Sequence, residues 1–439
     1  MTTLGDERPA VPVPGQFRAS GRGLARGSLL IAVGLGATGT ATLAMLFIVD
    51  HKLAATSAGA FNLWWVITTL LITPFGVFEA YLARLIVAEQ AAGREPRPVI
   101  ATLLGRTWMV AAGISVAALC AGPWLTRYEF GGDAGLAWLL PLWVMVTASQ
   151  AAQRGVATGK AKFPAIAVQL TVDGLLRVGI TAAIAFSGHA TADRLALGTC
   201  IAAAGGLVAG GLMCPAWLVR PTLRATGVSW GPVVLLLGGS VCPVLAGYAP
   251  APWLKAAGHA NPTTIIAFTA AVTLSRIPTQ FVSAAFGPLL SHLTHAAETG
   301  DLATYHRLRR LADQAAAGLG AGFVLVFAVL GVWLLPRFTH TPKGYQLSIG
   351  MLAVLALASA LMFVAVVQQA GMAATARWGA IAGAWGIGLV ALVVIFVLPV
   401  SALWRAAAAP AVAIAAALVA MAYGSWRAEA GGRIAAQPV

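Results

Sequence analysis

Residues 171–186 read TVDGLLRVGITAAIAF, an apolar run interrupted by two charges, Asp173 and Arg177. Together with the residues before it, the run predicts a membrane-spanning helix, in which a lone charge costs about 3 to more than 10 kcal/mol. A spacing of four places both charges on one helical face, where they can neutralise each other, and Gln169 extends the same stripe. Two interpretations stay open. Asp173 is an exchangeable counter-ion for a proton or cation, or the two residues form a permanent ion pair that locks the helix to its neighbours.

The composition of the whole chain is that of a polytopic membrane protein. Of its 439 residues, 59% are hydrophobic and 10% are charged, whereas soluble domains carry about 25% charged residues. The net charge of +14 comes from small basic groups between apolar segments, a pattern that does not favour nucleic-acid binding. The four cysteines lie in apolar runs without zinc or disulfide spacing. We find no P-loop, HExxH or GxSxG motif, and therefore predict no enzyme activity, metal site or cofactor.

Apolar segments of membrane-spanning length recur along the chain. A span needs roughly 20 apolar residues. On that measure the sequence predicts an all-α protein with twelve spans, near 27–49, 57–82, 101–123, 135–153, 164–187, 195–218, 231–254, 263–289, 314–335, 346–369, 378–399 and 402–424.

The distribution of Lys and Arg predicts the orientation. With the N-terminus in the cytoplasm, the predicted cytoplasmic segments hold 18 of the 28 basic residues and the opposite side holds seven. Because basic residues accumulate in cytoplasmic loops, we expect both terminal tails, residues 1–26 and 425–439, on the cytoplasmic side of a bacterial plasma membrane.

A weak internal repeat divides the chain into two halves. KFPAIA (162–167) matches RWGAIA (377–382), and Gly93 matches Gly300 at a slightly different offset. Each match joins a span to the span six positions later, which predicts two six-helix lobes, residues 27–219 and 231–424, joined by a cytoplasmic linker at 220–230. Helix interruptions in corresponding spans indicate the binding region of a transporter. We assign this role to Gly36 in the first span and to Pro243 and Pro250 in the seventh, although Gly and Pro are common in membrane helices generally.

Polar faces on the second and eighth spans predict a shared cavity. Steps of three and four residues keep each set on one helical face. The predicted substrate-binding residues are Asn62, Thr69 and Thr73 in the second span and Thr273, Arg276, Gln280 and Ser283 in the eighth. For the hydroxyls, simple helix-to-helix packing is the stronger alternative. Arg276 lies about 20 Å into its span at 1.5 Å per residue, so we expect a central aqueous cavity there, with a buried ion pair as the alternative.

Charges near the span ends are less informative. Arg26, Glu79, Arg84 and Arg106 are candidates for the cavity mouth, although solvated or snorkelling side chains are the default in such positions. Residues 291–314 combine helical periodicity with a basic end. This pattern predicts an interfacial helix on anionic lipid at the cytoplasmic face.

Three segments resemble one family. QRGVATGKAKFPAIAVQLTVDGLLR (153–177), SRIPTQFVSAAFGPLLSHLTHAAETGD (275–301) and SAGAFNLWWVITTLL (57–71) are similar to the fourth-to-fifth, eighth and second helices of bacterial polysaccharide flippases. These belong to the multidrug/oligosaccharidyl-lipid/polysaccharide (MOP) exporter superfamily. The resemblance implies a V-shaped central cavity, alternating access, and turnover driven by a cation gradient or the membrane potential. It also implies that Arg276 binds pyrophosphate and that Asp173 and Arg177 occupy the acidic and basic positions of the fifth helix.

The chain departs from the lipid II flippases of that superfamily. It has no arginine in the middle of the first span and lacks two further C-terminal helices, so another polyprenyl-linked glycan is the expected cargo. The first functional hypothesis is therefore a flippase for a polyprenyl-(pyro)phosphate-linked saccharide, with H⁺ or Na⁺ as coupling ion. The alternatives are an antiporter for drugs or organic cations, which should have an acidic cavity, and a membrane scaffold for glycosyltransferases or cell-wall assembly proteins.

Overall fold

The computed structural model describes residues 21–188, 190–223, 230–250, 286–338 and 347–430, with scattered positions between 253 and 282. Within these residues every regular element is a helix. In chain order they are α1 (Gly21–Lys52), α2 (Ala55–Ala91), α3 (Arg97–Tyr128), α4 (Ala134–Gly159), α5 (Phe163–Phe186), α6 (Ala192–Met213), the short 3₁₀ helix η2 (Pro215–Trp217), α7 (Gly231–Tyr248), α10 (Phe286–Glu298), α11 (Leu302–Phe338), α12 (Ile349–Ala374), α13 (Trp378–Val397) and α14 (Ala402–Ala430).

The described helices confirm an all-α, multi-pass membrane protein. Ten of them are long and apolar enough to cross a bilayer, judged by length and composition. The seventh predicted span appears as a shorter apolar helix, Val233–Gly247. The eighth, 263–289, is described only at scattered positions up to 282 and from Phe286 onward.

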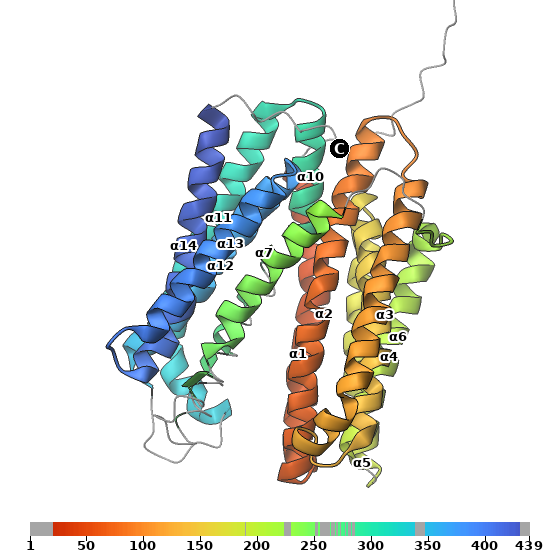
Figure 1. Ribbon diagram of the computed structural model, residues 1–439, viewed down its shortest axis with the longest axis vertical. Coiled ribbons are helices and arrows are strands. Elements are labelled where there is room, and N and C mark those ends of the chain that lie inside the picture. Colours follow the sequence, from red (N-terminus) through yellow and green to blue (C-terminus); the bar gives the residue numbers. More distant parts are fainter. Residues whose placement is uncertain are drawn as a thin grey trace, which may run out of the picture.

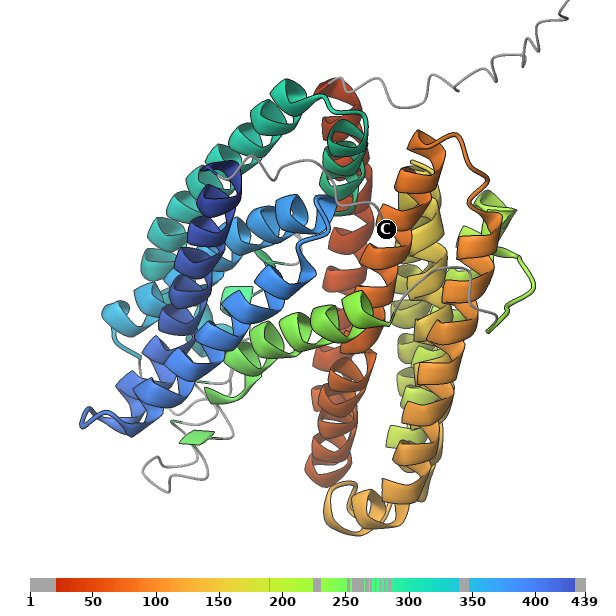
Figure 2. The ribbon, with the colours of Figure 1, turned by 45° about the horizontal axis from the view of Figure 1, so that its top comes forward.

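The helices form two lobes (Figure 1). Helices α1–α6 make the N-lobe, and α7 with α10–α14 makes the C-lobe. The lobes meet at the end of the molecule where residues 21 and 430 lie, which we call the terminal side, and diverge at the other end, the distal side (Figures 1 and 2).

The buried apolar clusters show why the lobes diverge. The terminal-side cluster combines both lobes and includes Phe78 and Tyr81 of the N-lobe with Leu290 and Trp378 of the C-lobe. On the distal side, one cluster is built from N-lobe residues and two others from C-lobe residues. Between membrane helices the cohesive term is close van der Waals packing rather than the hydrophobic effect. The buried clusters place that packing between the lobes on the terminal side and within each lobe on the distal side.

The repeat seen in the sequence corresponds to repeated backbone turns. Gly93 and Gly300 both have positive φ, 71° and 74°, and so do Ala161 and Ala376, 53° and 58°. Positive φ is uncommon for alanine, which makes the second pair informative. The hydrogen bonds recur too. Lys162 N donates to Ala157 O over 2.7 Å, and Arg377 N, 215 positions later, donates to Met372 O over 2.9 Å. The match between KFPAIA and RWGAIA therefore follows a shared turn.

Two helix boundaries differ from the prediction. Residues 291–314 do not form one interfacial helix, because the left-handed Gly300 turn divides them between α10 and α11. Asp301 caps the new helix by accepting a hydrogen bond from Thr304 N over 3.0 Å, which favours an N-terminus at this point. At the C-terminus, α14 continues to Ala430, so part of the predicted tail is helical.

Candidate functional site

A cavity of about 280 Å³ lies at the junction of the two lobes. The N-lobe contributes Thr69 and Thr73 from α2, while the other described lining residues belong to the C-lobe. They come from α7, the eighth-span positions, α12 and α14: Pro243, Val244, Val272, Ser275, Arg276, Thr279, Leu355, Ala358, Ser359, Met362, Pro410 and Ile414. The structure thus brings together four residues that the sequence singled out, Thr69, Thr73, Pro243 and Arg276.

Arg276 brings a positive charge to this wall. It is the one charged side chain among the described lining residues, and it is partly exposed. Its guanidinium lies against the backbone of Gly247 in α7, where an added Cβ would clash with both terminal nitrogens. Glycine at 247 therefore provides the space in which the guanidinium sits. Sequence reasoning missed Gly247, although it lies in the Gly- and Pro-rich seventh span.

The threonines of the cavity wall use their hydroxyl protons within α2. Thr69 Oγ1 donates to Trp65 O over 2.9 Å, and Thr73 Oγ1 donates to Thr69 O over 3.1 Å. Such bonds to the preceding turn are common for Ser and Thr inside helices. These side chains present an acceptor oxygen and a methyl group to the cavity. Ser359, from the middle of an apolar run in α12, was not singled out by its sequence and also lines the cavity.

Several predicted site residues cannot be placed against the cavity. Thr273, Gln280 and Ser283 lie outside the described residues, and the side chains of Asn62 and Arg26 are likewise not described. Gly36 lies within the uninterrupted helix α1, and Pro250 follows the end of α7 and is buried.

The charged residues Asp173 and Arg177 of α5 lie in the interior of the N-lobe. Arg177 Nη2 donates to both carboxylate oxygens of Asp173 over 2.9 Å, and Arg177 Nη1 donates to Thr42 Oγ1 of α1, also over 2.9 Å. The guanidinium carbon stands 5.2 Å from the Trp65 ring centroid and 5.9 Å from that of Trp143. Charge-assisted hydrogen bonds and cation–π contacts both stabilise a desolvated arginine.

Close helix packing surrounds this pair. Both side chains are 4% exposed. An added Cβ at Gly174 would lie 3.1 Å from backbone atoms of α1, and one at Gly206 would lie 2.9 Å from Asp173 Cβ. Glycine at these positions lets α1 and α6 approach α5 from two sides. Gln169, one turn earlier on α5, is also buried. The pair thus lies within a packed interior, and neither residue is among the described lining residues of the cavity.

Arg84 and Glu79 both form ion pairs, and the burial of Arg84 contradicts its predicted place at the cavity mouth. Arg84 is fully buried rather than solvated at a cavity mouth, and its Nη2 lies 3.1 Å from Glu298 Oε1 of α10. Its position results from the length of α2, which continues well past the predicted end of the span. Glu79 pairs with Arg154 of α4 over 2.8 Å, within the N-lobe.

Two further contacts join the two lobes on the terminal side. Ser291 Oγ of α10 donates to Thr158 O of α4 over 3.1 Å. The rings of Tyr81 and Trp378 meet edge to face at 5.7 Å, a favoured aromatic geometry. Helix α10 therefore packs against α2 and α4 on the terminal side, and Trp378 at the start of α13 adds a contact with α2.

Arg106 is placed by the inter-lobe linker. It is 5% exposed, and its guanidinium carbon lies 4.7 Å from the ring centroid of Trp230. Thr222 N of the linker donates to Ala101 O of α3 over 3.0 Å. The expectation of a cavity-mouth residue is wrong here, because the linker covers this side of α3.

The fold matches that of known transporters. No protein-family profile and no curated protein matches this sequence. Among solved structures, a MATE transporter in complex with MaD3S matches with a TM-score of 0.79 at 16% identity, covering 93% of this chain and 96% of that one. An outward-facing multidrug resistance MATE transporter of the MOP superfamily gives 0.77 at 14% identity, with coverages of 93% and 96%.

A third similar structure is a MOP superfamily transporter from Pyrococcus furiosus. It gives a TM-score of 0.76 at 15% identity, with coverages of 93% and 96%, and is described as having a binding pocket of reverse polarity that suggests a different function. At these identities the similarities show the fold alone, which is that of the MATE transporters.

Proposed function

We propose that this protein is a flippase that moves a polyprenyl-(pyro)phosphate-linked saccharide across a bacterial plasma membrane by alternating access. In this proposal the phosphate binds Arg276, and both termini are cytoplasmic. The terminal side is then the cytoplasmic side, sealed in this conformation, and the lobes diverge toward the outside.

One observation carries the proposal: Arg276 lies on the wall of a cavity shared by both lobes. A guanidinium binds phosphate oxygens through two parallel hydrogen bonds, and these strengthen where water is excluded. Apolar neighbours on the same wall, among them Leu355, Met362 and Ile414, lower the local polarity. The cavity, about 280 Å³, is near the lower end of the range of small-molecule sites, about 300 to 1,000 Å³. A cavity of this size suits the (pyro)phosphate group of the cargo, while the saccharide and the lipid chain extend beyond the cavity.

The competing hypothesis is an antiporter for drugs or organic cations, the activity that the name of one similar structure suggests. A cation entering this cavity approaches a fixed positive charge, and like charges at short range in a partly desolvated site repel each other strongly. The charge of Arg276 therefore favours an anionic cargo. One similar transporter is described as having a pocket of reverse polarity that suggests a different function.

Transport in liposomes tests the proposal. We expect purified protein to translocate polyprenyl-pyrophosphate-linked oligosaccharide, and Arg276→Ala to reduce the rate about tenfold or more with an unchanged melting temperature. Arg276→Lys should retain part of the activity, because a lysine ammonium keeps the positive charge but lacks the paired N–H donors of the guanidinium. Arg427→Ala is the matched control, since it removes an exposed arginine of α14. Equal transport by wild type and Arg276→Ala, or efflux of organic cations instead, contradicts the proposal. Absence of any transport favours the scaffold.

We further infer that Asp173 and Arg177 have a structural role. The support is the contact of Arg177 Nη2 with both carboxylate oxygens of Asp173, the additional bond to Thr42 and the close packing of α1 and α6 around them. A coupling ion, H⁺ or Na⁺, would then bind elsewhere in the protein.

A further inference from the structure

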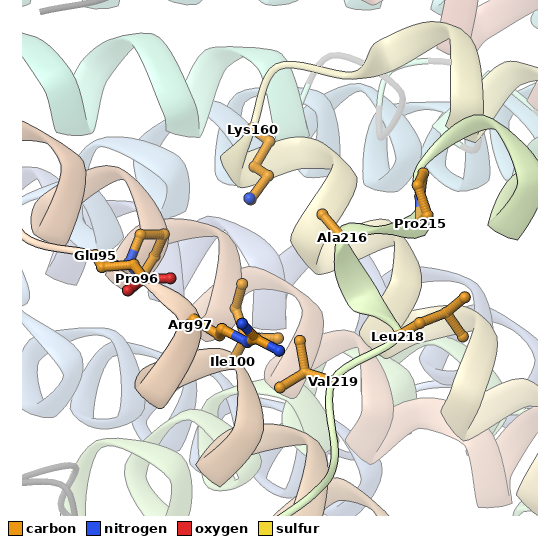
Figure 3. A pocket seen from close by; sticks show the side chains of 9 residues that line it. All are labelled: Glu95, Pro96, Arg97, Ile100, Lys160, Pro215, Ala216, Leu218 and Val219. Carbon is orange, nitrogen blue, oxygen red and sulfur yellow. The ribbon is translucent and has the colours of Figure 1, made fainter.

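A second pocket lies on the terminal side of the N-lobe, and none of its lining residues is shared with the cavity. Figure 3 shows this pocket from close by. Its volume is about 270 Å³. Three chain segments enclose it: the start of α3, the turn after α4, and the chain that follows α6 through η2. The lining residues are Glu95, Pro96, Arg97, Ile100, Lys160, Pro215, Ala216, Leu218 and Val219.

Two cations from different segments converge on this pocket. Lys160 extends its amine into the space from the turn after α4, and Arg97 extends its guanidinium from the first turn of α3 (Figure 3). Neither forms an ion pair with Glu95, since the ion pairs of the described residues join other partners. Arg94 is held elsewhere, at 2.7 Å from Glu89. Opposed cations in a concave site repel each other, and an anion between them relieves that repulsion.

An apolar surface adjoins the pocket. Leu218 lines it and is nevertheless 67% exposed, and Leu212 and Met213 at the end of α6 are 80% and 50% exposed. In a membrane protein such side chains face lipid. The pocket therefore has a charged interior next to a lipid-facing rim, at the ends of membrane-spanning helices.

We propose that this pocket binds the headgroup of a membrane phospholipid that carries both a phosphodiester and a primary ammonium. Arg97 and Lys160 hold the phosphate oxygens, as basic pockets between membrane helices do. Glu95 on the same lining accepts a hydrogen bond from the headgroup amine, and the acyl chains lie along Leu212, Met213 and Leu218. The lipid bridges α3, the α4–α5 turn and the segment after α6, and so stabilises the terminal side of the N-lobe. This site is independent of the transport proposal.

Lipid retention on the purified full-length protein tests the site. The protein is placed in nanodiscs of phosphatidylcholine with equal amounts of phosphatidylethanolamine and phosphatidylglycerol, and lipids retained on detergent extraction are quantified by native mass spectrometry. We expect phosphatidylethanolamine to be retained preferentially. Arg97→Gln with Lys160→Gln should reduce its retention about tenfold, as expected for the loss of two charge-assisted contacts. Glu95→Gln should abolish the preference over phosphatidylglycerol and leave phospholipid retention intact.

The matched control removes two other cations of the same surface, Lys162→Gln with Arg220→Gln. Both are exposed and outside the lining, and retention should be unchanged. Equal losses in the control and the pocket variant would show a diffuse charge effect and overturn the proposal, as would unchanged retention in the pocket variant. Stabilisation of the lipid-free protein by inorganic phosphate alone, with no lipid retained, would assign the pocket to a soluble anion instead.

Discussion

Each lobe contains an arginine within its membrane-spanning part, but the two lie in different environments. Arg177 of the N-lobe is 4% exposed, bonded to Asp173 and Thr42, and lies beside two tryptophan rings that contact each other. Arg276 of the C-lobe is partly exposed on a cavity wall and lies against the backbone of Gly247. From the sequence alone, both are simply charges in apolar runs.

The comparison separates two ways of accommodating a charge in a bilayer. In the N-lobe, α5 supplies the counter-charge one turn from the arginine, and glycines allow the neighbouring helices to close over the pair. In the C-lobe, a glycine instead makes room for the guanidinium beside a cavity. The same residue type thus lies in a packed interior in one lobe and on a cavity wall in the other. The following variants test that distinction.

Arg177→Gln should have the largest effect on stability. The substitution leaves the Asp173 carboxylate buried without its partner, which costs about 3–5 kcal/mol. We expect low expression and a strongly reduced melting temperature for Arg177→Gln, whereas Arg276→Gln should fold normally. Thermal unfolding of both variants in the same detergent measures the difference.

The double variant Asp173→Asn with Arg177→Gln distinguishes structure from coupling. Removing both charges leaves a neutral pair that can still form hydrogen bonds, so expression should recover and transport should return with it. A double variant that expresses well but does not transport would show that the pair couples an ion to transport. The two arginines would then both be functional.

A third arginine, Arg84, extends the comparison to the seam between the lobes. Glu298→Gln removes the charge that pairs with the buried Arg84, and the loss of a charged hydrogen bond costs about 1.5–3 kcal/mol. Because this pair joins the two lobes, we expect the terminal side to open more often. In a cysteine-free background, a cysteine at Thr158 should then react severalfold faster with an impermeant maleimide.

Glu79→Gln is the control for this variant. Glu79 forms an equivalent ion pair with Arg154, but within the N-lobe. Its loss should leave the labelling rate at position 158 unchanged. If both variants accelerate labelling equally, general loosening of the protein explains the effect, and α10 does not hold the terminal side closed.

Gly247→Ala tests whether the position of Arg276 matters. A methyl group there would displace the guanidinium, which is the flexible end of a long side chain, so the protein should still fold. Transport should fall about tenfold. Gly238→Ala on the same helix is the matched control, because a Cβ there meets no atom of the described residues within 4 Å. Equal activity of the two variants would mean that Arg276 tolerates displacement.

Much of the fold could be predicted from the sequence because the bilayer imposes strong constraints. The span lengths and the repeat that joins Gly93 with Gly300 follow from local sequence, whereas the orientation expected from the basic-residue bias stays a prediction. The candidate site was only partly predictable. Helical spacing brought Thr69, Thr73 and Arg276 onto suitable faces, but spacing does not reveal what lies across the helix interface.

The errors have the same physical origin. Arg84 and Arg106 were placed near span ends, yet Glu298 lies more than 200 positions from Arg84, and Trp230 covers Arg106 from the linker. Gly247 was missed because its role depends on a side chain from another helix. Pairings between distant segments determine whether a charge is sealed or accessible, and a single sequence does not encode them in any local pattern.

The smallest expected effect concerns the hydroxyls that the N-lobe presents to the cavity. Thr69 and Thr73 donate their protons to the backbone of α2, so they have none to offer a phosphate. Valine has nearly the same shape, and Thr69→Val with Thr73→Val should change transport by less than about threefold. Initial rates in liposomes, compared with Arg276→Ala, provide the measurement. A loss comparable to that of Arg276→Ala would mean that the hydroxyls leave their backbone acceptors when cargo binds. The N-lobe would then contribute polar contacts to the cargo, and the division of roles between the two lobes would have to be abandoned.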